Sequence, residues 1–369
     1  MTPRVTRSFL EANAADDTLI AAHLHRCHTL SVNGAQPLDR ESLHLDDRKL
    51  ASVPDWIGSL RSLRELHLDG NLLTSFSSAI ESLSALEVLH LRRNRLESIP
   101  EIISRLTSLR DLRVGKNLLT ELPDWLWDRV SLETLDLSEN RLSSLSPRIG
   151  RLTGLRVLDL GHNALSSIPE ALGELTRLRD GLYLSDNRLT SVPESLGTLR
   201  ELRYLSITDN ELTLLPETLG RLSKLRELRL YNNRLEALPE TLGGLSDLRE
   251  IHLANNGLTS LPESIGDLGS LRELRLSNNR IQSLPDAIGK LGRLTDLDLR
   301  NNEVTALPES VARLESLTHL DLRGNRLVYL PDGIRELPSL EKLDLRWNKL
   351  RAAPAWIAEL ERRGCAVLR

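Results

Sequence analysis

Histidine side chains are concentrated near the N-terminal end of the chain, where their spacing could support metal binding or a response to pH. Six of the nine histidines lie in the first quarter of the chain, and His44, His67 and His90 recur at one constant interval with Asp46 and Asp69 close behind. Imidazoles on adjacent strands could share a Zn²⁺ ion completed by carboxylates, or change charge at about pH 6.5. Metal sites usually have tight loop spacings such as Cys-x-x-Cys, which are lacking, so we predict a solvated face and no metal.

A second group combines the scarce tyrosines with basic residues. The chain has only four tyrosines, and three of them fall in consecutive repeats at positions that would face outward from a strand. Tyrosine and arginine are the side chains that most often anchor protein interfaces, although tyrosine also suits the surface of any strand. We predict a partner-binding patch made of Tyr183, Tyr204, Tyr231, Arg229, His252 and Arg275.

Acidic and basic residues alternate near the C-terminal end. Three successive repeats contain Asp-Leu-Arg, which places one column of aspartates beside one column of arginines. We expect these columns to neutralise each other on a solvated sheet, where each exposed pair contributes little stability. The six residues are Asp298, Asp321, Asp344, Arg300, Arg323 and Arg346.

Recognisable catalytic motifs are absent from the sequence. It contains no G-x-x-x-x-G-K-S/T loop, no H-E-x-x-H and no G-x-S-x-G. The two cysteines, Cys27 and Cys365, lie near the chain ends, so neither is expected on the strand surface as a nucleophile. We predict no enzyme activity and no cofactor.

The element that must position these side chains is a short repeated unit, of which Leu271–Arg293 is one copy. Leu274 and Leu276 alternate with polar residues, which predicts a short strand over 273–277. One unit cannot bury its own apolar face, so neighbouring units must stack upon it. We therefore expect one elongated core in place of several globular domains.

Three features of the unit predict how the chain turns away from the strand and returns. The amide of Asn279 is expected to bond backbone groups inside the turn. Pro285 and Asp286 suit the first turn of a short helix or 3₁₀ segment. Gly289 is expected to end that segment with a positive φ.

The turn asparagine recurs along the chain. Every step is 23 residues except the 24-residue step from Asn163 to Asn187, and Arg48 replaces the asparagine in the first of about 14 units. The extra residue lies beside Gly181, where it forms either a β-bulge that re-aims Tyr183 or a neutral insertion. The predicted structural ladder comprises Asn71, Asn94, Asn117, Asn140, Asn163, Asn187, Asn210, Asn233, Asn256, Asn279, Asn302, Asn325 and Asn348.

The pattern L-x-x-L-x-L-x-x-N-x-L, as at residues 225–235, resembles that of the leucine-rich-repeat family. The LPETLGGL-type half that follows is similar to Ras-suppressor and Ras-scaffold proteins, plant intracellular Ras-group proteins and their bacterial counterparts. The resemblance covers about residues 40–360. It implies an α/β solenoid: a horseshoe with a parallel β-sheet on the concave face and short helical or 3₁₀ segments on the convex face. It also implies a protein or peptide ligand, with a small GTPase or signalling enzyme as partner class.

Residues outside the repeats are expected to cover the ends of the stack. Residues 1–39 are predicted to form a helical N-terminal cap, and residues 40–353 the leucine-rich-repeat solenoid. Residues 354–369 are predicted to form a C-terminal cap that closes on Trp356, Ile357, Leu360 and Val367.

Composition limits the partners and the compartment. The net charge of −4 gives no bulk attraction to nucleic acid or an anionic membrane, and no stretch approaches ~18 apolar residues. The N-terminus has no apolar signal core, and the two cysteines are expected to lie too far apart to pair, which favours a reducing, cytoplasmic location. Richness in Ala, Arg and Leu indicates a bacterial source, and we expect a monomer.

The sequence therefore predicts a non-catalytic protein–protein interaction scaffold that binds its partner on the concave face. One alternative is a secreted bacterial effector exported into a host cell, because the N-terminal stretch rich in Thr, Ala, Asn and Asp does not exclude a secretion signal. The other is the recognition subunit of a multi-chain enzyme or signalling complex.

Overall fold

The computed structural model describes residues 41–352 and 354–369, so the N-terminal cap predicted over 1–39 lies outside the described residues. The chain divides into two compact units, a first that ends at Leu142 and a second that spans Ser143–Arg369. No helix in the described part of the chain has the length and apolar character needed to cross a lipid bilayer.

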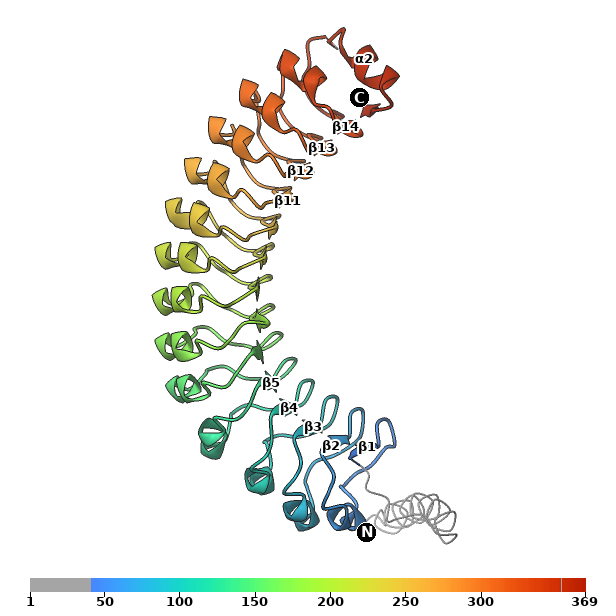
Figure 1. Cartoon of the computed structure of the whole chain (residues 1–369), viewed down its shortest axis with the longest axis vertical. Helices are drawn as coiled ribbons and strands as arrows, with labels where there is room; N and C mark the ends of the chain where they lie inside the picture. The colour runs from blue at the N-terminus through green and yellow to red at the C-terminus, as the bar shows by residue number, and fades with distance from the viewer. Residues whose placement is uncertain (1–40, 353) are drawn as a thin grey trace, which may run out of the picture. The chain divides into compact units, whose positions relative to one another are not determined.

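Each coil contributes one three-residue strand, and consecutive strands pair in parallel within each unit (Figure 1). The register sets equivalent coil positions side by side, for example His44 opposite His67. The first unit contains β1 (Ser42–His44), β2 (Glu65–His67), β3 (Val88–His90), β4 (Asp111–Arg113) and β5 (Thr134–Asp136). The second unit contains β6 (Val157–Asp159), β7 (Gly181–Tyr183), β8 (Tyr204–Ser206), β9 (Glu227–Arg229), β10 (Glu250–His252), β11 (Glu273–Arg275), β12 (Asp296–Asp298), β13 (His319–Asp321), β14 (Lys342–Asp344) and β15 (Ala366–Leu368).

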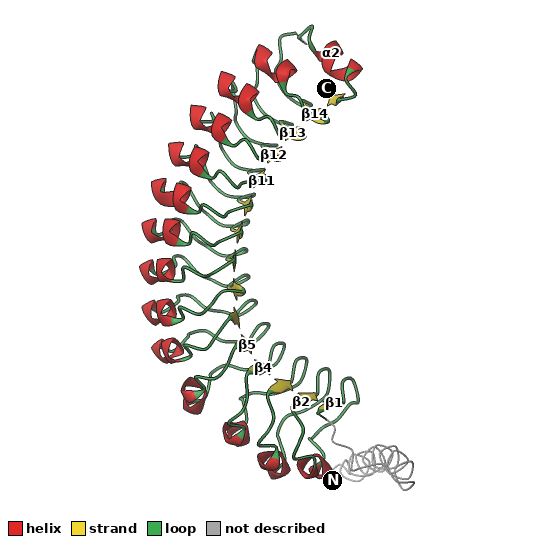
Figure 2. Ribbon diagram, in the orientation of Figure 1, coloured by secondary structure: helices red, strands yellow, loops and turns green. Residues whose placement is uncertain are grey.

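Five-residue 3₁₀ helices occupy the side of each coil opposite the strands (Figure 2). Most begin directly after a proline, and where serine replaces it the hydroxyls of Ser77 and Ser146 accept bonds from the amides of Ala79 and Arg148, both at 3.2 Å. The first unit contains η1 (Asp55–Ser59), η2 (Ser78–Ser82), η3 (Glu101–Arg105) and η4 (Asp124–Asp128). The second unit contains η5 (Pro147–Arg151), η6 (Glu170–Glu174), η7 (Glu194–Thr198), η8 (Glu217–Arg221), η9 (Glu240–Gly244), η10 (Glu263–Asp267), η11 (Asp286–Lys290), η12 (Glu309–Arg313) and η13 (Asp332–Glu336).

The core lies between the strands and the 3₁₀ helices. In the coil that begins at Leu271, the side chains of Leu274, Leu276 and Ile288 are fully buried. Each coil covers the apolar edge of the next, as the repeat requires. The predicted α/β solenoid, with a parallel sheet on one side and short 3₁₀ segments on the other, is confirmed in each unit.

The glycine of the repeat has a different purpose from the one predicted. Gly289 lies inside η11 and does not adopt a positive φ, so the expectation that it ends the segment in that conformation is wrong. A Cβ atom at this position would stand 2.3 Å from the carbonyl oxygen of Ser310 in the next coil. Glycine at this position therefore allows the close approach of η11 and η12.

The end of the second unit differs from the repeats. The helix α2 (Ile357–Arg362) follows the last full coil, and β15 extends the sheet by pairing with β14. Trp356, Ile357 and Leu360 are buried, and the indole Nε1 of Trp356 donates a hydrogen bond to Asp332 Oδ1 at 3.0 Å. The free thiol of Cys365 is buried as well.

Candidate functional site

The ladder asparagines hold the strands in register. The Nδ2 atom of Asn233 donates to the carbonyl oxygens of Ile207 (2.8 Å) and Leu230 (3.0 Å), while its Oδ1 accepts the amide of Leu212 at 3.0 Å. The same pattern recurs at other rungs, including Asn71 and Asn325. Because these asparagines tie their own coils to the preceding ones, the outward side chains keep fixed positions on the sheet within each unit.

A second asparagine column lies directly before the ladder on exposed turns. The residue preceding each ladder asparagine, from Gly70 to Trp347, has a positive φ. In the second unit the exposed amides at this position bond from one coil to the next, at 2.5–2.8 Å. This column was not predicted, although the Asn-Asn dipeptide repeated in consecutive coils is its signal in the sequence. Its members are Asp209, Asn232, Asn255, Asn278 and Asn301.

Two of the predicted tyrosines and one arginine meet on the outward face of the second unit. The rings of Tyr183 and Tyr204 are half-buried, with centroids 4.9 Å apart. The guanidinium carbon of Arg229 lies 5.5 Å from the centroid of the Tyr204 ring, within cation–π range. Burial raises the pKa of both phenols, Tyr183 and Tyr204, so both rings stay uncharged at neutral pH. Tyr231 follows β9 and is also half-buried.

The inserted residue is accommodated immediately before β7. The amides of Arg179, Asp180 and Gly181 all approach the carbonyl oxygen of Arg156, at 3.2, 2.9 and 3.4 Å. The strand then resumes the ordinary register, with Asp159 opposite Tyr183, so the insertion does not move Tyr183 out of its column. Gly181 instead makes room for the ring, because a Cβ atom there would lie 2.6 Å from Tyr183 Cε2.

The basic residues of the predicted patch are paired with acids on their own strands. Arg229 Nε lies 2.5 Å from Glu227 Oε1. Arg275 and His252 lie 2.6 and 3.4 Å from the glutamates two residues before them. The strand register places the three in one column, with each basic side chain beside a glutamate of its own strand. The structure thus brings together Tyr183, Tyr204 and Arg229, while His252 and Arg275 continue the column, each beside its own glutamate.

The Asp-Leu-Arg repeats form the expected ion pairs on β12–β14. Arg323 lies 2.7 Å from Asp321 and 3.2 Å from Asp344, and Arg346 lies 2.6 Å from Asp344. The side chain of Asp344 is only 1% exposed, so the prediction of a solvated pair is wrong for this residue. Burial alone would raise the pKa of Asp344, but the hydrogen bonds from Arg346 and the charge of Arg323 hold it below its ordinary value. An open hollow of about 180 Å³ is lined by β11–β14 here.

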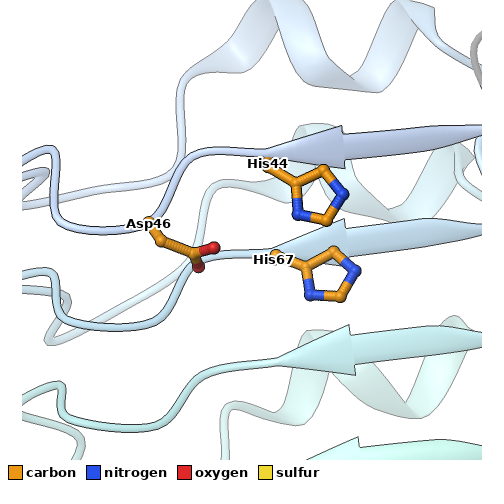
Figure 3. A group of neighbouring side chains, drawn as sticks. All are labelled: His44, Asp46 and His67. Carbon is orange, nitrogen blue, oxygen red and sulfur yellow. The ribbon is translucent and has the colours of Figure 1, made fainter.

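The predicted histidine column lies on the outward face of the first unit. The rings of His44 and His67 stack with centroids 4.1 Å apart, and His90 meets His67 edge-on at 4.4 Å. Asp46 extends toward the His44–His67 pair, and one potential ligand atom from each of the three lies within 4.8 Å of the others (Figure 3). Burial, followed by the charges of His90 and His44, lowers the pKa of His67.

Family comparisons cover almost the whole described chain. The model described as "Leucine rich repeat" matches residues 41–96, 61–119, 84–142 and 130–180, and the model "Leucine-rich repeat region" matches 182–278 and 259–362. The chain belongs to the leucine-rich-repeat proteins. Folds of this family generally mediate protein–protein interaction. The narrower likeness to Ras-suppressor proteins stays a prediction.

Solved structures place this leucine-rich-repeat protein among relatives with diverse ligands. It is 30% identical to a leucine-rich-repeat protein of Leptospira interrogans, over 92% of this chain and 97% of that one, with a TM-score of 0.71. It is 31% identical to the plant peptide hormone receptor RGFR1 in complex with RGF2, over 84% of this chain and 52% of that one (TM-score 0.73). It is 26% identical to TLR13 in a complex with ssRNA13, over 89% and 53% of the chains (TM-score 0.70). Comparison with curated protein sequences found no similar protein.

Proposed function

We propose that this protein is a non-catalytic scaffold that holds a protein or peptide partner on the outward face of the sheet in its second unit. The contact site centres on Tyr183, Tyr204 and Arg229, which are joined by a ring pair and a cation–π contact. This cluster carries the proposal. Its uncharged aromatic surface can be buried at an interface with little loss of side-chain entropy, which is why tyrosine is favoured in binding sites.

Tyr231 lies in the same coil as Arg229, and His252 and Arg275 extend the same surface in the next two coils. Their half-buried or ion-paired side chains leave hydrogen-bond donors at the rim, where they give orientation and specificity more than affinity. The site therefore resembles a small aromatic centre with a polar border, the usual anatomy of a protein interface.

Charge favours a protein partner over RNA, although one similar structure is a complex with single-stranded RNA. RNA binding needs basic side chains that are free to neutralise phosphates. Here Arg229, His252 and Arg275 each lie beside a glutamate on the same strand, and the chain has a net charge of −4. The similarity to a receptor in complex with RGF2 supports the protein or peptide alternative.

The partner class and the compartment are part of the proposal. By family resemblance we propose a small GTPase or a signalling enzyme as partner, bound by a cytoplasmic monomer. An effector exported into a host cell and a recognition subunit of a larger complex would use the same face, so they differ in location and assembly, not in the residues that bind.

The proposal is tested by capturing partners with matched variants. The triple variant Tyr183→Ala/Tyr204→Ala/Tyr231→Ala should lose at least ~100-fold in captured partner, because hot-spot aromatic residues each contribute about 2 kcal/mol or more. The control changes exposed residues of the 3₁₀ helices in three consecutive coils, Glu217→Ala/Glu240→Ala/Glu263→Ala. Quantitative mass spectrometry of both pull-downs should show loss only with the tyrosine variant, while both variants keep the parent's far-UV circular dichroism. Equal capture by parent and tyrosine variant would overturn the proposal.

A further inference from the structure

We propose that His44, Asp46 and His67 form a binding site for a divalent transition-metal ion on the outward face of the first unit, against the expectation from sequence alone. The donors come from two adjacent coils: His44 ends β1, Asp46 follows two residues later, and His67 ends β2. One donor atom from each residue lies within 4.8 Å of the other two (Figure 3). His44 and His67 are a full repeat apart along the chain, and the parallel register sets them opposite one another.

The donor set selects the class of ion. Two imidazole nitrogens and one carboxylate oxygen suit zinc, nickel, copper or cobalt, whereas calcium and magnesium prefer six or more oxygen ligands. Three protein ligands leave at least one coordination position for water or for a donor from a bound molecule. The proposed site therefore has the composition of an open transition-metal site.

Neighbouring groups already orient two of the three ligands. Asp46 Oδ1 accepts the amide of Asp69 at 2.7 Å, which fixes the carboxylate. The hydroxyl of Ser42 lies 3.1 Å from His44 Nε2, so the second nitrogen of that ring is the one left for a metal. Such outer contacts hold ligand side chains in place at metal sites. In Figure 3 each imidazole turns one nitrogen toward the side on which Asp46 lies.

One ring nitrogen of the third ligand is left unsatisfied. The buried Nε2 atom of His67 has no hydrogen-bond partner among the described residues, and Glu65 Oε2 lies 3.7 Å away. A buried ring nitrogen without a partner is costly. Coordination through the other nitrogen would turn the ring and give this Nε2 a route to Glu65 or to water.

Metal binding requires only side-chain rotation. A tetrahedral ion with Zn–N bonds of about 2.0–2.1 Å holds two ligand nitrogens about 3.3 Å apart. The stacked rings have centroids 4.1 Å apart, so both must turn about their Cβ–Cγ bonds to aim at one ion. The strands themselves can stay in place, because His44 and His67 are already opposite one another in the register. The bound ion would link β1 to β2.

A second triad provides an internal contrast. Glu227, Glu250 and His252 also have potential ligand atoms within 4.8 Å of one another. However, Glu227 is engaged by Arg229 at 2.5 Å, so an ion there would have to compete with a guanidinium. We therefore assign the metal to the histidine pair and use His252 as the control.

The test uses the full chain without a histidine tag, freed of metal by a chelator. His23, His25 and His28 lie outside the described residues and could bind metal themselves, so all are changed to Gln in the parent. Isothermal titration with Zn²⁺ and the visible absorption of Co²⁺ should show one bound equivalent. His67→Gln and His44→Gln should each weaken Zn²⁺ binding at least tenfold, and the milder change Asp46→Asn should weaken Zn²⁺ binding as well.

Two matched variants complete the experiment. His90→Gln changes the next rung of the same column, and His252→Gln changes the other triad; both should bind Zn²⁺ within about threefold of the parent. Metal should also slow hydrogen exchange of the β1 and β2 amides in the parent but not in His67→Gln. The proposal is overturned if the parent binds no Zn²⁺, if His67→Gln binds like the parent, or if His252→Gln removes the bound equivalent.

Discussion

Two stretches of one sheet in the second unit, β7–β9 and β12–β14, share a backbone and differ in what faces outward. On β12–β14 the aspartates and arginines form ion pairs, and Asp344, which is paired with two arginines, is almost fully buried. On β7–β9 the rings of Tyr183 and Tyr204 pack together but keep half-exposed apolar surface. Charges that neutralise one another hold the scaffold together, whereas aromatic surface without a cover is available to a partner.

The hollow lined by β11–β14 does not reverse this interpretation. Its volume is about 180 Å³, and its walls carry Asp298, Asp321 and Asp344, which are paired with arginines. A group entering it must first compete with ion pairs at 2.6–3.3 Å. Displacing paired charges costs desolvation that a new contact has to offset, so we place the partner on the tyrosine side.

The largest expected loss of stability comes from breaking the buried ion pair of Asp344, and the more exposed pair of Asp298 serves as its comparison. Asp344→Asn replaces one carboxylate oxygen by an amide nitrogen, which cannot accept a hydrogen bond from Arg346, and should lower the free energy of unfolding by about 1.5–3 kcal/mol. Asp298→Asn occupies the same column but faces a more exposed arginine, and should cost less than about 1 kcal/mol. Urea denaturation and hydrogen exchange of the β14 amides measure both. Equal losses of unfolding free energy in the two variants would show that the burial of Asp344 adds nothing to stability.

Acid should remove the difference in stability between the parent and Asp344→Asn. Because the pKa of Asp344 in the folded protein lies below its ordinary value of 3.8, its contribution to stability is present above that pH. The contribution is lost as pH falls through the folded-state pKa, where the carboxyl group becomes protonated. The stabilities of parent and Asp344→Asn, measured by denaturation from pH 6 downward, should therefore converge as the pH falls below 3.8 and through the folded-state pKa. A constant gap over this range would contradict the assignment.

An intermediate effect is expected on the tyrosine side. Gly181→Ala places a methyl group against the Tyr183 ring and should cost about 1–2 kcal/mol of unfolding free energy. In a Tyr183→Ala background the same change should cost close to nothing, because the clashing ring is gone. This double-mutant cycle isolates the contact. A cost that persists without the ring would instead indicate backbone strain at the insertion.

The smallest effect should come from removing hydroxyl groups alone. Tyr183→Phe and Tyr204→Phe keep the ring pair and the cation–π contact, so partner capture should change by less than about threefold and stability by less than about 0.5 kcal/mol. Alanine at either position should weaken capture at least tenfold. If phenylalanine and alanine variants behave alike, the hydroxyl groups and not the rings carry recognition.

The sequence was sufficient for the architecture because leucine spacing determines which side chains enter the core. The constant repeat length also predicted which residues share a column, and the register of His44 with His67 follows from it. The ion-pair partner of each basic side chain could not be predicted, because Arg229 could reach Glu227 on its own strand or an acid on the next strand. The purpose of Gly289 was hidden for a related reason: its neighbour, Ser310, belongs to another coil.

The central claim is that a partner touches the tyrosine side of the sheet. Its most direct test replaces Tyr231 with the photo-crosslinking amino acid p-benzoylphenylalanine, which has a similar shape, and compares it with the same replacement at Asp321 on β13 and at Glu217 on η8. We expect one partner to be crosslinked from position 231, with little or no crosslinking from positions 321 and 217. Crosslinking that is strongest from Asp321 or Glu217 would contradict it.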